Sequence, residues 1–480
     1  MASSSPSKLL DLPDEMFLSI LTKLNTIDVF HLKGLNKRID NIVYDEVITN
    51  NELLDLFCLK ILPDIHYKIQ SLNVELSSMK PIFLTTIYPN LYKLGLYNVD
   101  ANTFFFYWRV RNNNSFLNIY KNQITSFIIR FNNKSQRLLS DSLRVIFTSI
   151  FKIFTNLDYL NFTANLVDHQ QISFGFSSPP SIVSMNLLKL NINVNCFNDC
   201  LYLLDGRFEN LHTLCVRISR INADETTINN KKILFKLKYF SLTSDASTNV
   251  YDELIVPLIH RMLNLEKLRL YLLVVHKETF IDGNNLKYNI INYLLNLKQF
   301  GFNIHSFIPS DNPNDLPSNE DIRKSLINVG NNYSFSYINY YPESRMGHCN
   351  IYSYSCSNEM KFYYNITNNF QSEIYQFVTE ISLFDEYPFE HEFFIRISQS
   401  FPFIEKTNLP IAQFIHIIAL NFDDAHDDYI EQFLFDTKTC LSNNVSIMVE
   451  YYQLVRVTHN FKRPATKNNC QQCGYKYDDE

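Results

Sequence analysis

Apolar residues recur along the chain in one short pattern, apolar-x-x-apolar-x-apolar, in which most x positions are polar. The middle residues of successive matches lie 22 to 33 positions apart. Each match predicts a short strand with alternate residues pointing into a core, followed by a segment that returns to the next strand. The nine matches are Ile69/Leu72/Val74, Leu91/Leu94/Leu96, Ile124/Phe127/Ile129, Leu157/Leu160/Phe162, Leu187/Leu190/Ile192, Leu211/Leu214/Val216, Leu237/Phe240/Leu242, Leu265/Leu268/Leu270 and Leu297/Phe300/Phe302.

Two of the returning segments carry a helical apolar pattern. The first is predicted from one shared helical face, made by Leu139, Leu143, Ile146, Phe147 and Ile150. The second runs from Leu254 to Met262 and has Pro257 in its first turn, where a missing N–H is tolerated.

Beyond residue 308 the pattern weakens. Residues 309–322 are rich in Pro, Asn, Asp and Ser, which predicts a loop or linker. Residues 323–460 alternate well enough for further strands, including 333–341 and 350–354, and 427–441 predicts an amphipathic helix. We interpret 323–460 as degenerate repeats with a C-terminal cap, and 461–480 as a tail.

The first fifty residues have a different, helical pattern. Pro13 stands at a first helical position, and Phe17, Ile20, Leu21 and Leu24 then form one apolar face. Asp28 and Asn36 predict the starts of a second and a third short helix. Three helices in under forty residues cannot enclose a large core. Part of this apolar surface must therefore contact either the rest of the chain or a partner protein.

Residues 9–44 resemble the F-box. The resemblance rests on the Leu-Pro start, the acidic pair that follows it, the amphipathic first helix, the Asp-led second helix and the basic pair that opens the third. Asn36 and Ile39 depart from the Cys and Trp common in that family. The resemblance implies that the segment docks on the Skp adaptor of a Skp–cullin–F-box ubiquitin ligase. The docking positions that it implies are Leu12, Pro13, Ile20, Leu21, Leu24, Val29 and Leu32. The alternative is an ordinary N-terminal helical cap on the repeats, and the agreement of start signal, spacing and helix order favours the F-box over it.

The nine matches resemble leucine-rich repeats. In that family an Asn three residues past the last strand position caps the turn, and here Asn132, Asn165 and Asn195 supply it in three successive repeats only. The expected fold is therefore α/β: a three-helix F-box domain (8–50), then an irregular leucine-rich-repeat solenoid (51–308) with helical or irregular return segments.

The composition indicates a folded chain whose net charge does not attract polyanions such as nucleic acids. The 480 residues are 46% hydrophobic and 19% charged, with a net charge of -6. The nine cysteines are scattered, as in proteins of a reducing compartment. The Ser-rich start is no signal peptide, and no apolar run approaches the ~20 residues of a membrane span. We expect a cytoplasmic or nuclear protein that binds neither nucleic acid nor membrane.

Four local clusters suggest chemistry but have simpler explanations. Residues 423–428 concentrate carboxylates just before a predicted helix, which favours capping over a metal. Cys470 and Cys473 have zinc-ligand spacing without a second pair, and Cys196 and Cys200 also lack partners. The basic residues around Arg463 are interpreted as part of a solvated tail. No common catalytic motif is present, so we expect no catalytic residue, cofactor or metal.

The sequence thus predicts a non-catalytic substrate receptor that joins a Skp adaptor, and through it a cullin–RING ligase, to an unknown target protein. The alternative is an interaction scaffold with no ligase role; an enzyme is the weakest candidate. Target binding is expected from residues between the strand leucines. These are Tyr92, Lys93, Asp158, Tyr159, Lys189, His212, Thr213, Lys238, Tyr239, Glu266, Lys267, Lys298 and Gln299.

Overall fold

The computed structural model describes the chain from residue 58 onward, with gaps. The described residues are 58–59, 62–100, 104, 119–131, 140–164, 171–175, 181–223, 232–275, 278–329, 334–353, 362–370, 375, 378, 380–383, 391–400, 412–414, 419–421, 427–435, 439–441, 446–449, 451–466 and 474–475. The predicted F-box domain, with its seven docking positions, lies outside them. The chain divides into two compact units: unit 1 runs to Ser219 and includes Glu225–Lys232, and unit 2 comprises Arg220–Asp224 and Ile233–Glu480.

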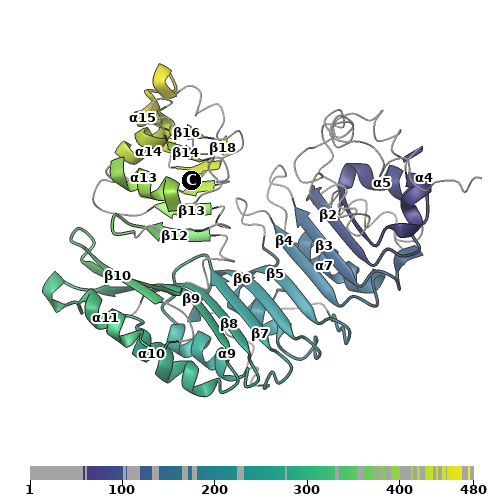
Figure 1. The fold of residues 1–480 in the computed structure, drawn as a ribbon, viewed down its shortest axis with the longest axis horizontal. Helices are drawn as coiled ribbons and strands as arrows, with labels where there is room; N and C mark the ends of the chain where they lie inside the picture. The colour runs from purple at the N-terminus through teal and green to yellow at the C-terminus, as the bar shows by residue number, and fades with distance from the viewer. Residues whose placement is uncertain are drawn as a thin grey trace, which may run out of the picture. The chain divides into compact units, whose positions relative to one another are not determined.

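Unit 1 alternates strands with short helical segments (Figure 1). In chain order these are α4 (Leu62–Ile65), η2 (His66–Lys68), β1 (Ser71–Glu75), α5 (Leu76–Thr85), β2 (Lys93–Val99), β3 (Ser126–Phe131), α7 (Ser140–Ile153), β4 (Tyr159–Ala164), β5 (Lys189–Cys196), α8 (Phe197–Leu203) and β6 (Thr213–Arg220).

Unit 2 continues this alternation and then changes character. Its first elements are β7 (Tyr239–Ser244), η5 (Tyr251–Ile255), α9 (Val256–His260), β8 (Lys267–Val275), α10 (Gly283–Asn289), η6 (Ile291–Tyr293), β9 (Gln299–Pro309), η7 (Pro313–Asp315), α11 (Asn319–Ser325), β10 (Ser334–Tyr341) and β11 (Met346–Ser353). The remaining elements are β12 (Phe362–Ile366), β13 (Glu380–Leu383), α13 (His391–Ser400), β14 (Ala412–Phe414), β15 (Ala419–Asn421), α14 (Asp427–Leu434), β16 (Thr439–Leu441), β17 (Ser446–Met448), α15 (Tyr451–Thr458), η8 (Pro464–Thr466) and β18 (Gly474–Tyr475).

The architecture expected from the sequence is wrong. In place of a three-helix F-box followed by a solenoid, the described residues form one 11-stranded, mostly parallel sheet with few helices, in the order β1 to β9, then β11 and β10. The α/β class is compatible with this sheet. A five-stranded sheet (β12-β13-β15-β17-β18) and the pair β14-β16 are separate from it. The apolar motif reports which residues of a strand face a core, but not how many strands join edge to edge or how the chain continues after the last match.

The predicted strand positions are confirmed, and the structure adds a shared register between the strands. Each of β1 to β9 contains the middle and last apolar residues of one match. Where the register is described, the middle residues of neighbouring strands stand directly opposite one another. These pairs are Leu72↔Leu94, Leu94↔Phe127, Phe127↔Leu160, Leu160↔Leu190, Phe240↔Leu268 and Leu268↔Phe300.

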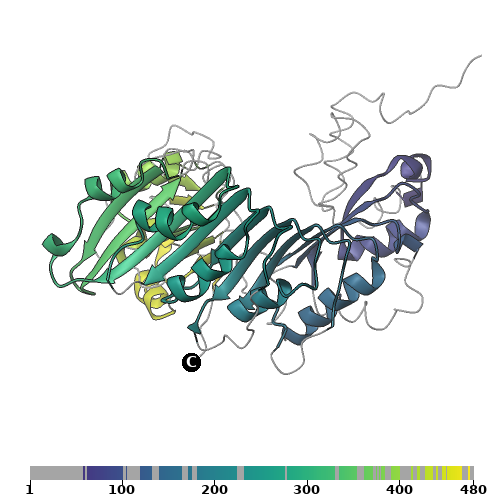
Figure 2. The same cartoon turned by 90° about the horizontal axis from the view of Figure 1, so that it is seen from below.

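The apolar side of the strands packs against helices. In unit 1 the ring of Phe147 on α7 meets that of Phe162 on β4 edge-on, with ring centroids 5.4 Å apart. This confirms the helix predicted after residue 139. In unit 2, α9, α10 and α11 lie along one face of the strands (Figure 2), and their side chains Leu258, Leu286 and Ile322 are buried. Burial of this apolar surface is the main stabilising contribution in each unit.

A row of asparagine side chains stabilises the turns that precede the strands. Asn156 donates to the carbonyl oxygen of Asn122 at 2.9 Å, and Asn186 donates to that of Thr155 at 2.9 Å. The same contact recurs at Asn90, Asn210, Asn264 and Asn296. Each Asn directly precedes the first apolar residue of a match. The asparagines expected from the sequence lie after the strand, so this position before the strand was not predicted.

Strands β9 and β11 of the sheet are buried on both faces. β11 pairs antiparallel with β9 and with β10, so the predicted strands near 333–341 and 350–354 form a hairpin that ends the parallel order. On the helix side, Ile281 donates its N–H to Ser306 Oγ at 3.2 Å. On the opposite side, Asn339 donates to Thr367 Oγ1 at 3.0 Å. Residues 309–322, predicted as a loop or linker, contain η7 and the start of α11.

Two histidines meet inside this doubly buried region. His305 Nδ1 lies 3.1 Å from His348 Nε2, and the ring planes are nearly parallel. Tyr341 Oη lies 3.3 Å from the other nitrogen of His348, and Tyr337 packs edge-on against the same ring. Burial lowers the pKa of His305 to about 3 and lowers that of His348 well below its ordinary value, with His305 contributing to the second shift. Both imidazoles are therefore neutral in the folded protein.

We predict that this pair makes the protein less stable in mild acid. Below pH ~6.5 the unfolded chain takes up protons on both histidines while the folded chain does not, so stability falls by about 1.4 kcal/mol per pH unit for each imidazole until the folded pKa is reached. In urea unfolding between pH 7.5 and 4.5, a His305→Gln/His348→Gln variant should show a shallower pH dependence than wild type. The half-exposed His212→Gln is the matched control, and an unchanged slope in the double variant would contradict the assignment.

Candidate binding surface

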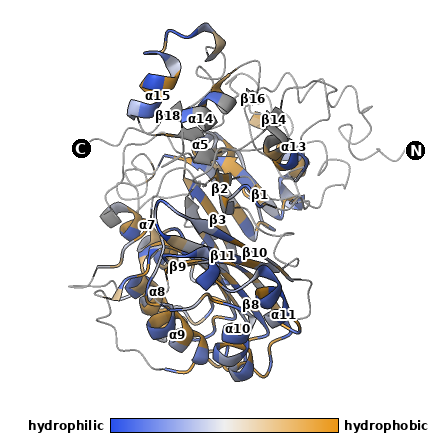
Figure 3. Ribbon diagram, turned by 90° about the vertical axis from the view of Figure 1, so that its left-hand side faces the viewer, coloured by the Kyte–Doolittle hydropathy of each residue, from blue (hydrophilic) through white to orange (hydrophobic). Residues whose placement is uncertain are grey.

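The strands present a second face that differs in chemistry from the packed one. Along β5, Leu190, Ile192 and Val194 are buried, whereas the alternating Asn191 and Asn193 are half-exposed. β6 and β7 show the same alternation, and hydrophobic and hydrophilic colours alternate along the strands in Figure 3. This period of two places polar residues of neighbouring strands on one face.

The residues predicted to bind a target fall into two groups. One group begins the strands on the half-exposed face: Lys93, Tyr159, Lys189, Thr213, Tyr239, Lys267 and Gln299. The other group lies in the turn just before a strand: Tyr92, Asp158, His212, Lys238, Glu266 and Lys298. In four of these residues, Tyr92, Asp158, Lys238 and Glu266, the carbonyl oxygen accepts from the start of the next strand, as Asp158 does from Lys189 N at 2.9 Å. The second group therefore shapes the edge of the surface.

In unit 1 five side chains make a cluster on this face, which we call the tyrosine–arginine cluster: Tyr97, Arg130, Tyr159, Asn161 and Asn191. The Arg130 guanidinium lies over the Tyr97 ring, 5.1 Å from its centroid. Asn191 Nδ2 donates to Tyr159 Oη at 3.3 Å. Register pairs Asn161 directly with Asn191. The cluster thus combines two aromatic rings, one exposed cation and amide groups that both donate and accept.

The phenol of Tyr159 is neutral in this setting. Burial raises its pKa above the ordinary value, and a hydrogen bond with Asn161 offsets only part of that rise. Arg130 lowers the same pKa and Tyr97 raises it, since both lie close enough to act on the phenol. A neutral Tyr159 can donate or accept a hydrogen bond to a partner, and its ring offers apolar area.

The half-exposed face of unit 1 is positively charged. From β1 to β6 it carries Lys93, Arg130, Lys189 and Arg217 against one carboxylate, Glu75, although the whole chain has a net charge of -6. Aromatic and arginine side chains are enriched in protein interfaces, and cations favour partners that carry carboxylates. The arrangement supports binding of a protein.

Four members of the cluster were missed in the sequence. The predicted set took only the two x positions between the first and middle apolar residues. Asn161 and Asn191 stand between the middle and last apolar residues, and Tyr97 and Arg130 follow the last one. Extending the period of two past the motif would have identified them.

Unit 2 has a smaller version of the same arrangement. The ring of Tyr239 on β7 has Lys267 Nζ 4.9 Å and the Arg269 guanidinium 5.7 Å from its centroid. In the adjoining turns, Glu266 contacts Lys238 at 3.1 Å and Lys298 at 2.7 Å. These two hydrogen bonds lower the pKa of Glu266 and keep it ionised.

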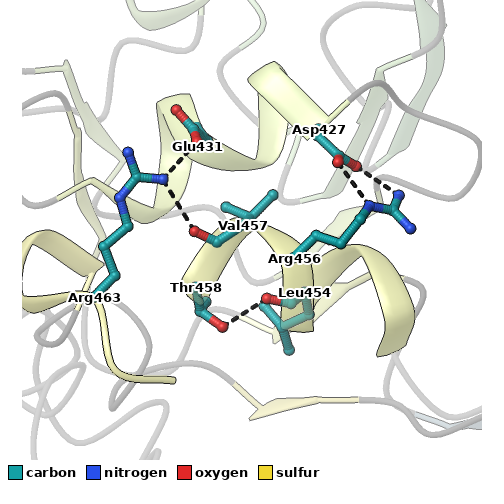
Figure 4. Close-up of polar contacts among 7 residues, drawn as sticks. All are labelled: Asp427, Glu431, Leu454, Arg456, Val457, Thr458 and Arg463. Atoms are coloured by element: carbon teal, nitrogen blue, oxygen red, sulfur yellow. Dashed lines mark hydrogen bonds and ion pairs between the residues drawn. The ribbon is translucent and has the colours of Figure 1, made fainter. Parts of the chain in front are cut away.

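The chemical candidates outside this face are structural where they are described. Asp427, which begins α14, accepts two hydrogen bonds of 2.9 Å from Arg456 on α15 (Figure 4). Arg463 does not belong to a solvated tail: it pairs with Glu431 and lies over the Phe435 ring, 4.2 Å from its centroid. α14 ends at Leu434 and β16 follows, so the predicted helix over 427–441 is too long.

Of the two cysteine pairs noted in the sequence, the structure describes one. Cys196 caps α8 with Asp199, whose carboxylate accepts from Cys196 N at 3.1 Å, and Cys200 is buried. Cys470 and Cys473 lie outside the described residues. Among those described, no three His, Cys, Asp or Glu side chains are grouped so that they could hold a metal ion.

Comparisons with known proteins identify no relative. No protein-family model matches the chain, and no curated protein sequence matches it. Within the part of the chain that the structure describes, no helix is both long and apolar enough to cross a membrane.

The alkylation rate of Cys215 tests whether the half-exposed face of the sheet is accessible to solvent. Cys215 lies on β6 in the half-exposed face, whereas Cys200 and Cys349 are buried, and burial raises the pKa of the Cys349 thiol. Because the thiolate is the reactive form, we expect iodoacetamide to alkylate Cys215 at least about tenfold faster than the other two. Peptide-resolved mass spectrometry over a time course measures the three rates, and equal rates would contradict the exposure assigned to this face.

Proposed function

We propose that this chain is a non-catalytic adaptor that holds a target protein on the half-exposed face of its sheet and joins it to a Skp-type ubiquitin-ligase adaptor. The observation that carries the target-binding half is the tyrosine–arginine cluster, with its cationic surroundings. The ligase half is supported by the resemblance of residues 9–44 to the F-box.

Such a protein acts by proximity. The target's lysines would be held near a charged ubiquitin carrier, which raises their effective concentration there, while bond formation takes place on other subunits. The face in unit 1 suits this role because it combines aromatic area, amides and cations. These groups recognise a protein surface through packing, hydrogen bonds and charge.

The ligase half is tested by direct binding. Purified full-length chain should bind a Skp adaptor, and Leu12→Asp and Ile20→Asp should each weaken binding at least about tenfold, because a carboxylate would be buried in an apolar contact. Ser19→Asp adds the same charge at a polar position of the same segment and is the matched control. Calorimetry measures all four proteins. If wild type does not bind, the ligase role is lost.

Target binding and Skp binding, measured in the same variants, distinguish a ligase adaptor from a scaffold without a ligase role. Proteins that associate with wild type should be lost with Arg130→Glu/Lys189→Glu and retained with Leu12→Asp. Skp binding should show the opposite dependence. A scaffold would keep its targets but fail to bind Skp in every form.

A further inference from the structure

Three consecutive turns of unit 2 share one backbone arrangement. They are residues 233–238, 261–266 and 293–298, which precede β7, β8 and β9 (Figure 1). In each turn the fifth residue donates its N–H to the carbonyl oxygen of the second, at 3.0 to 3.3 Å. Asn264 donates to the carbonyl oxygen of Phe235 at 2.9 Å, and Asn296 to that of Leu263 at 3.4 Å, which fixes the turns side by side.

The third residue of each turn is a large apolar side chain in solvent. Phe235 is 59% exposed, Leu263 39% and Leu295 89%. Ile233 and Tyr293, at the first position of two of the turns, are also exposed. We call these five residues the apolar turn row. Neighbouring exposed apolar residues of this kind mark interaction sites more often than isolated ones do.

The equivalent turns of unit 1 show that the fold does not require an apolar residue here. The turn hydrogen bond recurs from Leu91 to Tyr88 at 3.3 Å and from Leu211 to Phe208 at 3.1 Å. The third position of those two turns is Pro89 and Glu209, both exposed. In the turn before β4 it is Thr155, and in the turn before β5 it is Met185, which is exposed like the apolar residues of unit 2. Thr155 and Glu209 show that a polar residue is compatible with the turn. The turn itself therefore does not require the run of three large apolar residues in consecutive turns of unit 2.

The charges among these turns indicate the partner's chemistry. The three six-residue turns contain four cations, Lys236, Lys238, Arg261 and Lys298, and one carboxylate, Glu266. Glu266 is already engaged by Lys238 and Lys298. A partner that covers the row meets apolar area bordered by positive charge, so carboxylates on the partner are favoured and cations are disfavoured.

We propose that the apolar turn row is a second protein-docking site, which takes a segment that presents apolar side chains next to Asp or Glu. The site is separate from the tyrosine–arginine cluster and does not depend on the Skp interaction. Its energy comes from burial of the three central side chains, and the cations select among partners.

A random peptide library, displayed and selected on the full-length chain, tests this proposal. Enriched peptides should combine Leu, Ile or Phe with Asp or Glu. After synthesis, their Kd should rise at least about tenfold for Phe235→Ser/Leu263→Ser/Leu295→Ser, because truncation of central apolar anchors dominates such contacts. Leu84→Ser/Ile327→Ser/Tyr452→Ser removes three comparably exposed large hydrophobic side chains outside the turns that precede the strands, and is the matched control.

A charge variant keeps the proposal testable if the serine variant folds poorly. Lys236→Glu/Lys298→Glu leaves the row intact and should weaken acidic peptides while making their binding less sensitive to salt. The proposal is overturned if no selected peptide distinguishes the row variants from the control, or if the peptides that do are basic. It is also overturned if sedimentation shows wild-type self-association that the serine variant abolishes, since the row would then join two copies of this chain.

Discussion

Parallel pairing of the strands in a single register is the constraint on which the tyrosine–arginine cluster and the apolar turn row both depend. Neighbouring strands place Leu72, Leu94, Phe127 and Leu160 opposite one another on the buried side. Because a strand alternates its side chains, the same register places polar residues of successive strands together on the other side. A shift of one residue in any strand would move its apolar set into water. Burial of the apolar residues therefore fixes the polar surface as well.

The sequence predicted the part of the fold that repeats. The apolar motif located β1 to β9, and the helical pattern after residue 139 located α7. The extent of the sheet and its antiparallel end could not be predicted, because strand pairing beyond the last match depends on contacts far apart in the chain. The pairs Ser306–Cys349 and His305–Asn350 are examples, each joining residues more than forty positions apart.

Only part of the candidate binding surface was predicted, because the apolar motif covers only part of each strand. Lys93, Tyr159 and Lys189 were identified because they lie inside the motif, whereas Tyr97 and Arg130 lie just beyond it. The asparagine row was missed since its contacts join turns about thirty residues apart. The apolar turn row becomes visible only when the turns of the two units are compared. In our proposal both surfaces hold other proteins, and their apolar, aromatic, amide and cationic side chains would select among those proteins.

Cross-linking across β4 and β5 tests the shared register most directly. Asn161 and Asn191 stand opposite each other, so their Cα atoms lie within the ~4.4–6.8 Å that a disulfide spans. Under mild oxidation an Asn161→Cys/Asn191→Cys variant should form this disulfide in high yield, identified by peptide mapping. Asn161→Cys/Asn195→Cys, on the same face but four residues further along β5, should not. Equal cross-linking of both pairs, or of the second alone, would contradict the register and the surfaces that follow from it.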